Sequence, residues 1–252
     1  MSSSLRILCL SSSTPKGGST VKAVLGAINA GSLPNVEIVA LATTRPNAGV
    51  RSLALQCGME EREMVTLPPS SAGKEALAEA ILQAYTSFGA NCIWQNGWTR
   101  HTPAQVVQYC YGRIINQHGG ALNPAATLNG KRFDFGGSGM KGRATFAAQL
   151  YYAHMIKADF QARAVTHFVT EEIDGGGVIR EWKVPIFKND TVETLARRMG
   201  PVEKMVQIAT LGDFASHGRV SVIQPEGIAH TALEVEALQQ ARARAIADYP
   251  NG

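Results

Sequence analysis

The chain has 252 residues, 45% of them hydrophobic and 17% charged, with 25 glycines and a formal net charge of +4. These values exclude a disordered or fibrous chain, and the length is enough for one large α/β domain with a buried core. The small positive charge comes without a run of lysines or arginines, so it favours an anionic small ligand over a nucleic-acid surface.

The cysteines and the apolar segments further limit the class of protein that this sequence can encode. The cysteines show no CxxC spacing, which predicts reduced, buried side chains rather than a metal site or a disulfide framework. The sequence shows no signal peptide and no apolar run near the length of about 20 residues that crosses a membrane. We therefore expect a cytoplasmic protein. The four cysteines are Cys9, Cys57, Cys92 and Cys110.

The first element is an apolar run from Leu5 to Leu10, typical of a buried strand, followed by the glycine-rich segment 11–20 and a helical pattern. This layout can bind phosphate through backbone N–H groups at the start of the helix. Next to Gly18, the hydroxyls of Ser19 and Thr20 add donors, and we expect them to cap the helix. Many first turns of α/β domains are glycine-rich without binding anything, so both interpretations stay open here.

The remaining elements follow in alternation. Further strands are predicted over 36–41, 64–67, 91–95, 113–118, 165–169, 178–184 and 218–224. Helices are predicted over 50–57, 74–88, 103–111, 143–153, from about 190 onward with a kink or break at Pro201, and over 231–246. This order predicts a Rossmann-like α/β fold: an open, mostly parallel twisted sheet with helices on both faces and an antiparallel strand near the C-terminal part. We expect a single domain over 1–252, with a helical tail over 223–252.

Two polar clusters stand at predicted strand ends. The apolar strand 113–118 ends in Asn116, Gln117 and His118 and continues into two glycines. Ligands of open α/β sheets bind outside the carboxyl ends of the strands, and residues two apart on a strand project to the same side. About fifty residues later, Asp174 precedes three glycines. A single histidine or an Asp before glycines is more often structural, so the combination carries the interpretation.

These motifs, Asn-x-His and then His-Phe-Val-Thr-Glu-Glu-x-Asp-Gly-Gly, resemble those of the folate-dependent formyltransferases. The resemblance is closest to the branch that formylates glycinamide ribonucleotide in purine synthesis. It covers about 5–222 and is strongest over 91–203. It implies a catalytic trio of Asn116, His118 and Asp174, supported by His167, and 10-formyltetrahydrofolate as co-substrate, with no metal.

The resemblance also implies binding residues, several of which have plainer interpretations. Residues implied to bind the phosphate and amine of the acceptor are Gly18, Ser19, Thr20 and Glu203. Residues implied to bind folate are Gly97, Trp98, Arg100, Thr170 and Glu171. From the residues alone, Trp98 could be a core aromatic and Glu203 a solvent-facing helix residue. Arg100 could pair with a carboxylate or phosphate of the substrate.

The chemistry of formyl transfer suits the implied trio. The reaction needs a neutral amine, a polarised formyl carbonyl and a route for the proton that the amine loses. His118 would donate to the developing oxyanion, a role in which one donor is worth about 3 kcal/mol. Asn116 would orient the carbonyl, and Asp174 would keep the histidine cationic and shuttle the proton.

The sequence departs from the family at several positions. After His118 the usual Pro-Ser-Leu-Leu-Pro is replaced by residues 119–124, and a longer segment 125–132 follows. The glycine-rich block 134–142 resembles a variant found in one branch of the family, and it either closes over a ligand or only leads into a helix. A serine that assists in relatives is Val165 here.

The departures leave alternatives open. The same chemistry could act on a different amine, the chain could hydrolyse formyltetrahydrofolate, or it could be a binding relative without catalysis. The hydrolases carry an amino-terminal regulatory domain, and methionyl-tRNA formyltransferases carry a carboxy-terminal RNA-binding barrel, so both are disfavoured. We expect small-molecule substrates, no nucleic acid or membrane, and a monomer or homodimer.

Overall fold

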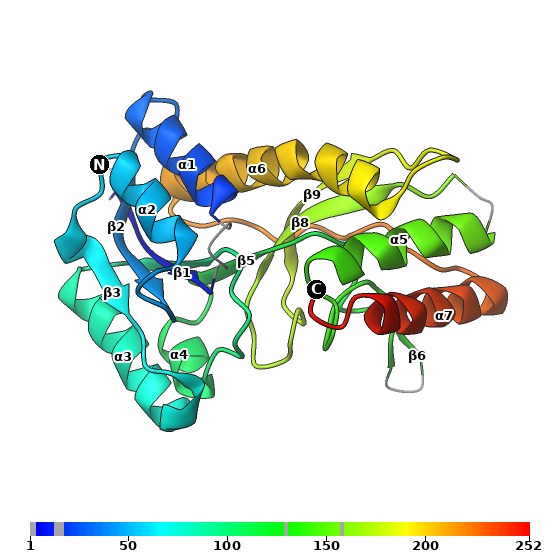
Figure 1. The fold of residues 1–252 in the computed structure, drawn as a ribbon, viewed down its shortest axis with the longest axis horizontal. Coiled ribbons are helices and arrows are strands. Elements are labelled where there is room, and N and C mark those ends of the chain that lie inside the picture. Colours follow the sequence, from blue (N-terminus) through cyan, green and yellow to red (C-terminus); the bar gives the residue numbers. More distant parts are fainter. Residues whose placement is uncertain (1–3, 13–17, 129–130, 157–158) are drawn as a thin grey trace. The chain divides into compact units, whose positions relative to one another are not determined.

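The structure of the chain, a computed structural model, describes residues 4–12, 18–128, 131–156 and 159–252 (Figure 1). Its main sheet has seven strands in the order β3-β2-β1-β4-β5-β8-β9. The chain forms two compact units, and it passes from the first to the second within β5 (Ile114–His118). The first unit comprises Met1–Asn116 and Gln207–Val220, and the second comprises Gln117–Val206 and Ser221–Gly252.

The first unit is a parallel α/β layer. Strand β1 pairs with β2 and β4, β2 with β3, and β4 with β5, all in parallel. Near-continuous apolar strands such as β1 are typical of a parallel sheet covered on its faces. Helix α1 packs beside α2, and α3 beside α4. The elements are β1 (Leu5–Ser11), α1 (Ser19–Asn29), β2 (Val36–Thr43), α2 (Gly49–Gln56), β3 (Met64–Thr66), α3 (Gly73–Ser87), β4 (Cys92–Gln95) and α4 (Ala104–Tyr109).

The start of α1 differs from the prediction. Gly18 occupies the N-cap position with φ of 103°, and no side chain caps the helix, so the capping role predicted for Ser19 and Thr20 is wrong. A Cβ at Gly18 would lie 2.8 Å from the Cα of Val50. The close packing of α2 therefore requires glycine, and the two hydroxyl residues become the first residues of the helix.

The second unit contains the antiparallel part of the sheet. Strands β8 and β9 pair antiparallel from Ala162 opposite Val184 onward. Helix α6 begins after a Thr191–Thr194 capping contact and runs through Pro201 without dividing. The elements are β6 (Thr127–Leu128), β7 (Lys131–Arg132), α5 (Arg143–Ile156), β8 (Ala162–Phe168), β9 (Val178–Val184) and α7 (Ala232–Asp248), with the first part of α6 (Val192–His217), whose residues from Gln207 onward belong to the first unit.

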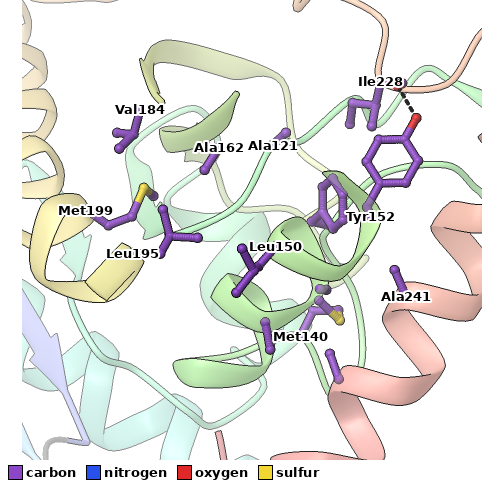
Figure 2. Packing of buried hydrophobic residues seen from close by; sticks show 14 of the residues in the cluster. Ala121, Met140, Leu150, Tyr152, Ala162, Val184, Leu195, Met199, Ile228 and Ala241 are labelled. Atoms are coloured by element: carbon purple, nitrogen blue, oxygen red, sulfur yellow. Dashed lines mark hydrogen bonds between the residues drawn. The ribbon is translucent and has the colours of Figure 1, made fainter. Parts of the chain in front are cut away.

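The core of the second unit is an apolar cluster in which α5 lies along α7 (Figures 1 and 2). Leu150 and Tyr152 come from α5, and Ala241 comes from α7. The buried hydroxyl of Tyr152 donates a hydrogen bond to the carbonyl of Ile228 at 2.7 Å, so its polar atom is satisfied inside the core. Leu195 of α6 closes the same cluster. The C-terminal helix is thus an integral part of this unit.

The predicted fold class, an α/β fold with a mostly parallel sheet and an antiparallel strand, is confirmed. The strand predicted over 218–224 is wrong. That segment contains no strand, although a backbone hydrogen bond from Ile223 to Val178 joins it to β9. The single domain over 1–252 stays a prediction. Among the described helices, none combines the length and the apolar character that crossing a membrane requires.

Candidate active site

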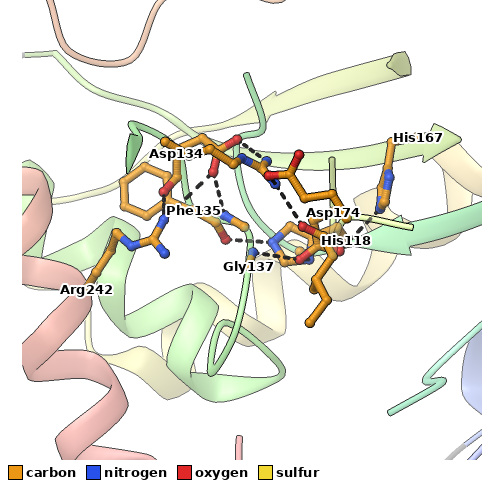
Figure 3. A network of polar contacts seen from close by, with 12 residues as sticks. His118, Asp134, Phe135, Gly137, His167, Asp174 and Arg242 are labelled. Carbon is orange, nitrogen blue, oxygen red and sulfur yellow. Dashed lines mark hydrogen bonds and ion pairs between the residues drawn. The ribbon is translucent and has the colours of Figure 1, made fainter. Parts of the chain in front are cut away.

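His118 is the last residue of β5 and is 6% exposed. Its Nε2 lies 2.7 Å from the carbonyl oxygen of Phe135, and its Nδ1 lies 3.7 Å from Oδ2 of Asp174 (Figure 3). Both ring nitrogens therefore face oxygen atoms. The Phe135 carbonyl can only accept a hydrogen bond, so Nε2 carries the proton of that contact, while Nδ1 faces the carboxylate of Asp174.

Asp174 lies in the loop between β8 and β9 with φ of 53°, a conformation uncommon outside glycine. Its Oδ2 accepts a hydrogen bond from the backbone N–H of Gly137 at 2.9 Å, and its Oδ1 lies 3.5 Å from Nε2 of His167. The carboxylate thus stands between two imidazoles.

The charge state of Asp174 follows from these partners. Burial by itself raises the pKa of this carboxyl, but the facing His118, the hydrogen bond and charge of His167 and the Gly137 N–H outweigh it. The pKa of Asp174 is therefore held well below its usual range. The carboxylate is ionised at neutral pH and acts first as an electrostatic partner.

The glycines after Asp174 make its loop possible. A Cβ at Gly176 would lie 1.9 Å from the carbonyl oxygen of Phe168, which already accepts from Nδ1 of His167 at 2.8 Å. No larger residue fits there without moving the end of β8. The glycine run therefore allows the loop to fold back closely against the strand that carries His167.

Glu203 occupies a second polar position in the same unit. Its Oε1 would lie 2.9 Å from a Cβ at Gly119, the residue after His118, and its side chain is hydrogen-bonded to Gln117. Burial raises the pKa of Glu203 to about 7, against the smaller opposing effects of Gln117 and Lys204. The predicted solvent-facing alternative for this glutamate does not fit that environment.

Asn116 is the last residue of the first unit and pairs with Gln95 of β4. It stands two residues before His118 on the same strand. The implied folate residues of this unit lie in the turn after β4. There Gly97, with φ of 62°, accepts a hydrogen bond from the N–H of Ser12 at 3.1 Å. The ends of β1 and β4 are thus joined.

The other residues of that turn are partly buried. The indole N–H of Trp98 is buried and has no hydrogen-bond partner within the described chain. Arg100 donates from Nη1 to the carbonyl of Pro68 at 2.6 Å, and burial lowers its pKa. Gly18, Ser19 and Thr20 form the start of α1, while residues 13–17 of the predicted phosphate loop lie outside the described residues.

Thr170 and Glu171 follow β8 in the second unit. The hydroxyl of Thr170 donates to the carbonyl of Glu172 at 3.1 Å, and Glu171 is exposed. Val165, where relatives have a serine, is fully buried in an apolar cluster with Leu122 and Val178. The apolar side chain of Val165 therefore has apolar neighbours where the relatives place a hydroxyl.

The structure brings His118, His167 and Asp174 together, and it adds two backbone contacts that sequence reasoning missed. These are the carbonyl of Phe135 on His118 and the N–H of Gly137 on Asp174. Backbone atoms leave no residue signature; the density of glycines over 134–142 was the available signal. Gly136 lies between them, and a Cβ there would be 2.9 Å from the Cβ of Asp174.

The cysteines and possible metal ligands add nothing to the site. Cys9, Cys92 and Cys110 are buried and free, as predicted, and Cys57 is partly exposed. Burial raises the pKa of Cys92 to about 12 and that of Cys110 to about 11, so neither thiol is activated. The described residues contain no group of three or more His, Cys, Asp or Glu able to hold a metal ion.

Comparison with known proteins adds family information. The formyl transferase family profile matches residues 5–211. The chain is 25% identical over 198 residues to a chloroplastic phosphoribosylglycinamide formyltransferase of Arabidopsis thaliana, covering 78% of this chain and 61% of that protein. Its fold is similar to that of glycinamide ribonucleotide transformylase 1 from Symbiobacterium toebii, with a TM-score of 0.68, 22% identity, and coverage of 87% and 94% of the two chains. The phosphoribosylglycinamide formyltransferase of Brucella melitensis gives a TM-score of 0.67 at 27% identity, covering 87% and 100% of the two chains.

Proposed function

Because the chain belongs to the formyl transferase family, we propose that it transfers a formyl group from 10-formyltetrahydrofolate to the primary amine of glycinamide ribonucleotide, a step of purine synthesis. The observation that carries the catalytic part is the buried pair of His118 and Asp174, 3.7 Å apart. The choice of glycinamide ribonucleotide as the acceptor is supported by the similarity to phosphoribosylglycinamide formyltransferases.

The reaction begins when the neutral amine attacks the formyl carbon. A nitrogen–carbon bond forms, and the carbonyl oxygen gains negative charge. His118 donates its Nε2–H to that oxygen, and ionised Asp174, which faces the other ring nitrogen, stabilises the positive charge of the ring. Asn116, two residues earlier on β5, orients the carbonyl. The bond between the formyl carbon and the folate nitrogen then breaks.

The proton balance gives Asp174 its second role. The amine loses one proton and the folate nitrogen gains one. A carboxylate with a depressed pKa is a weak base, so we propose that it relays this proton through water rather than holding it. His167 keeps the carboxylate oriented through its contact with Oδ1.

The contact between His118 and Phe135 constrains how the substrate enters. In the structure the Nε2–H of His118 points at the Phe135 carbonyl. We propose that the formyl oxygen takes over this N–H in the reactive complex, while Nδ1 keeps its contact with Asp174. The Phe135 carbonyl then turns away from His118 when folate binds, while Gly137 keeps its hydrogen bond to Asp174.

The binding residues divide by chemistry. Glu203 would hold the amine end of the acceptor, and the start of α1 at Gly18, Ser19 and Thr20 would hold its phosphate. Gly97, Trp98 and Arg100, with Thr170 and Glu171, would hold the folate. Arg100 uses Nη1 on the carbonyl of Pro68, and the fork of its guanidinium has further N–H groups suited to a carboxylate.

One observation favours a second candidate, the same transfer to a different amine. A Cβ at Gly119 would lie 2.7 Å from the ring of Phe146 and 2.9 Å from Glu203, so the proline of relatives does not fit this position. The neighbourhood of Glu203 is therefore built differently from that of the family.

The experiment that tests the proposal is a spectrophotometric assay of folate product release from 10-formyl-5,8-dideazafolate. It is run with glycinamide ribonucleotide, with other amines and with no acceptor. We expect release that depends on glycinamide ribonucleotide. Release only with another amine would support the second candidate, and release without acceptor would mean hydrolysis.

We also propose that the enzyme works in the cytoplasm on small-molecule substrates, as a monomer or homodimer. Light scattering after size-exclusion chromatography separates the two states.

A further inference from the structure

Asp134 is a fully buried carboxylate between two arginines, none of which the proposed reaction uses. Its Oδ2 pairs with Nη2 of Arg132, and its Oδ1 lies 3.7 Å from Nη1 of Arg242 (Figure 3). The backbone N–H groups of Asn123 and Gly136 also donate to this carboxylate, at 2.9 and 3.0 Å. A buried carboxylate with this many donors is rigidly held.

Asp134 begins the segment that contacts the catalytic pair. The next residue, Phe135, offers its carbonyl to His118, and Gly137 donates its N–H to Asp174. The side chain of Asp134 accepts from Gly136 in between and so fixes the turn. The position of Asp134 therefore sets the positions of both backbone groups.

Arg132 ties this segment to the loop of Asp174. While Nη2 holds Asp134, Nη1 donates to the carbonyl of Ile173 at 2.8 Å. Ile173 directly precedes Asp174, whose φ of 53° persists only where surrounding contacts impose it. The guanidinium of Arg132 thus connects the segment that begins at Asp134 with the loop that carries Asp174.

Arg242 brings the C-terminal helix into the same arrangement. It donates from Nη1 to the backbone carbonyl of Asp134. Its Nη2 would lie 3.7 Å from a Cβ at Gly137, and a Cβ at Gly139 would lie 2.9 Å from Ile246 of the same helix. The glycine-rich loop therefore rests on α7.

We propose that Arg132 and Arg242 are positioning residues for the reaction: through Asp134 and Ile173 they fix the Gly137 N–H and the Asp174 loop beside His118. The catalytic part of this inference rests on the proposed function. Neither arginine touches the reacting atoms, so their loss should lower kcat and leave the KM of both substrates nearly unchanged.

The test uses Arg242→Met, which keeps the packing of the side-chain stem but removes the donors. Arg244→Ala is the matched control, because this arginine of the same helix is 61% exposed and pairs with Asp248 at the surface. We expect kcat of Arg242→Met to fall about 10- to 100-fold, because a misplacement of about 1 Å at the reacting groups costs up to about that much, with KM within about twofold. Arg242→Lys should recover part of the loss, since lysine keeps a cation but not the fork.

A second readout does not depend on activity. Amide hydrogen exchange, measured by NMR, reports the hydrogen bond from Gly137 to Asp174. We expect this amide to exchange at least about tenfold faster in Arg242→Met and in Arg132→Lys than in wild type or Arg244→Ala. Thermal unfolding of each variant separates this local effect from global destabilisation.

The outcomes are distinct. If kcat of Arg242→Met stays within twofold of Arg244→Ala, or if Gly137 exchange is unchanged, the positioning role is overturned. If Arg242→Met does not fold, Arg242→Lys and Arg132→Lys decide by the same two criteria. If wild type transfers no formyl group to glycinamide ribonucleotide, the proposed function fails. The exchange measurement then still tests whether Arg132 and Arg242 position Gly137.

Discussion

A buried carboxylate between two imidazoles is the feature on which the proposed chemistry depends. Asp174 is 10% exposed, yet its partners hold it in the ionised form. An isolated buried carboxylate would take up a proton instead. His118, His167 and the Gly137 N–H together stabilise the charge of Asp174, and the contact with Nδ1 of His118 leaves the Nε2–H of that ring to donate to an oxyanion.

The depressed pKa of Asp174 predicts a pH-dependent contribution to stability. In the unfolded chain the pKa of an Asp carboxyl is about 3.9, and in the folded protein the pKa of Asp174 is lower. The stabilisation is therefore present above about pH 4 and is lost as the pH falls toward about 2. We expect wild type to exceed Asp174→Asn in free energy of unfolding by roughly 2 kcal/mol at neutral pH, and this gap to close in acid. Urea unfolding across this pH range measures it. A gap that does not change with pH would contradict the assigned ionisation.

Glu203 predicts a pH effect on substrate binding rather than on stability. Burial raises its pKa to about 7, so it is neutral below that pH and ionised above it. If it binds the acceptor amine, the KM for that amine should fall as the pH rises through about 7, and Glu203→Gln should lose this dependence and bind the amine more weakly. Glu193→Gln, an exposed site on the same helix, is the control. The same pH trend in wild type and Glu203→Gln would exclude the role.

At the scale of elements, the loop 134–142 depends on glycine where it passes Asp174. A Cβ at Gly136 would lie 2.6 Å from Leu122 and 2.9 Å from Asp174. We expect Gly136→Ala to lower the free energy of unfolding by about 1 to 3 kcal/mol. It should also reduce kcat about tenfold or more, because the added Cβ forces the loop 134–142 away from Asp174.

The control is Gly26→Ala in the middle of α1, where an added Cβ meets no atom within 4 Å among the described residues. This change should stabilise the protein by about 0.5 to 1 kcal/mol through helix propensity. Chemical denaturation and steady-state kinetics compare the two variants. Equal behaviour of both would mean that Gly136 is not under steric constraint.

The elements were predicted well where a segment has a clear residue pattern and glycine or proline at its ends. Strand β9, over Val178–Val184, was predicted at its observed bounds because a segment of β-type residues stands between a glycine run and Pro185. The segment 218–224 has a similar apolar content but forms no ladder, since strand pairing depends on partners that a local pattern does not encode. The hairpin of β6 and β7 has two-residue strands, too short for any periodicity.

The same limit applies to the site. His118, His167 and Asp174 carry side chains that mark them at strand ends, and the structure brings them together. Phe135 and Gly137 act through backbone atoms, which any residue possesses. Their roles, and those of Arg132 and Arg242, became visible only when the chain was folded.

For the whole molecule, the region that matches the family and the region that supports the candidate site differ in extent. The family profile covers 5–211, whereas the C-terminal helix that carries Arg242 lies beyond it. The helix packs along α5 in the core, so it belongs to the fold of the second unit. The support for the catalytic loop thus comes partly from a segment outside the matched region.

The most direct test of the central claim is to detect formylated glycinamide ribonucleotide by mass spectrometry after incubation with 10-formyl-5,8-dideazafolate. Wild type and Asp174→Asn are compared side by side, with folate binding measured by calorimetry. We predict product from wild type, a loss of at least about 100-fold in turnover for Asp174→Asn, and similar folate affinity for both. Near-normal turnover by Asp174→Asn would contradict the roles assigned to His118 and Asp174, and no product from folate-binding wild type would contradict the assigned acceptor.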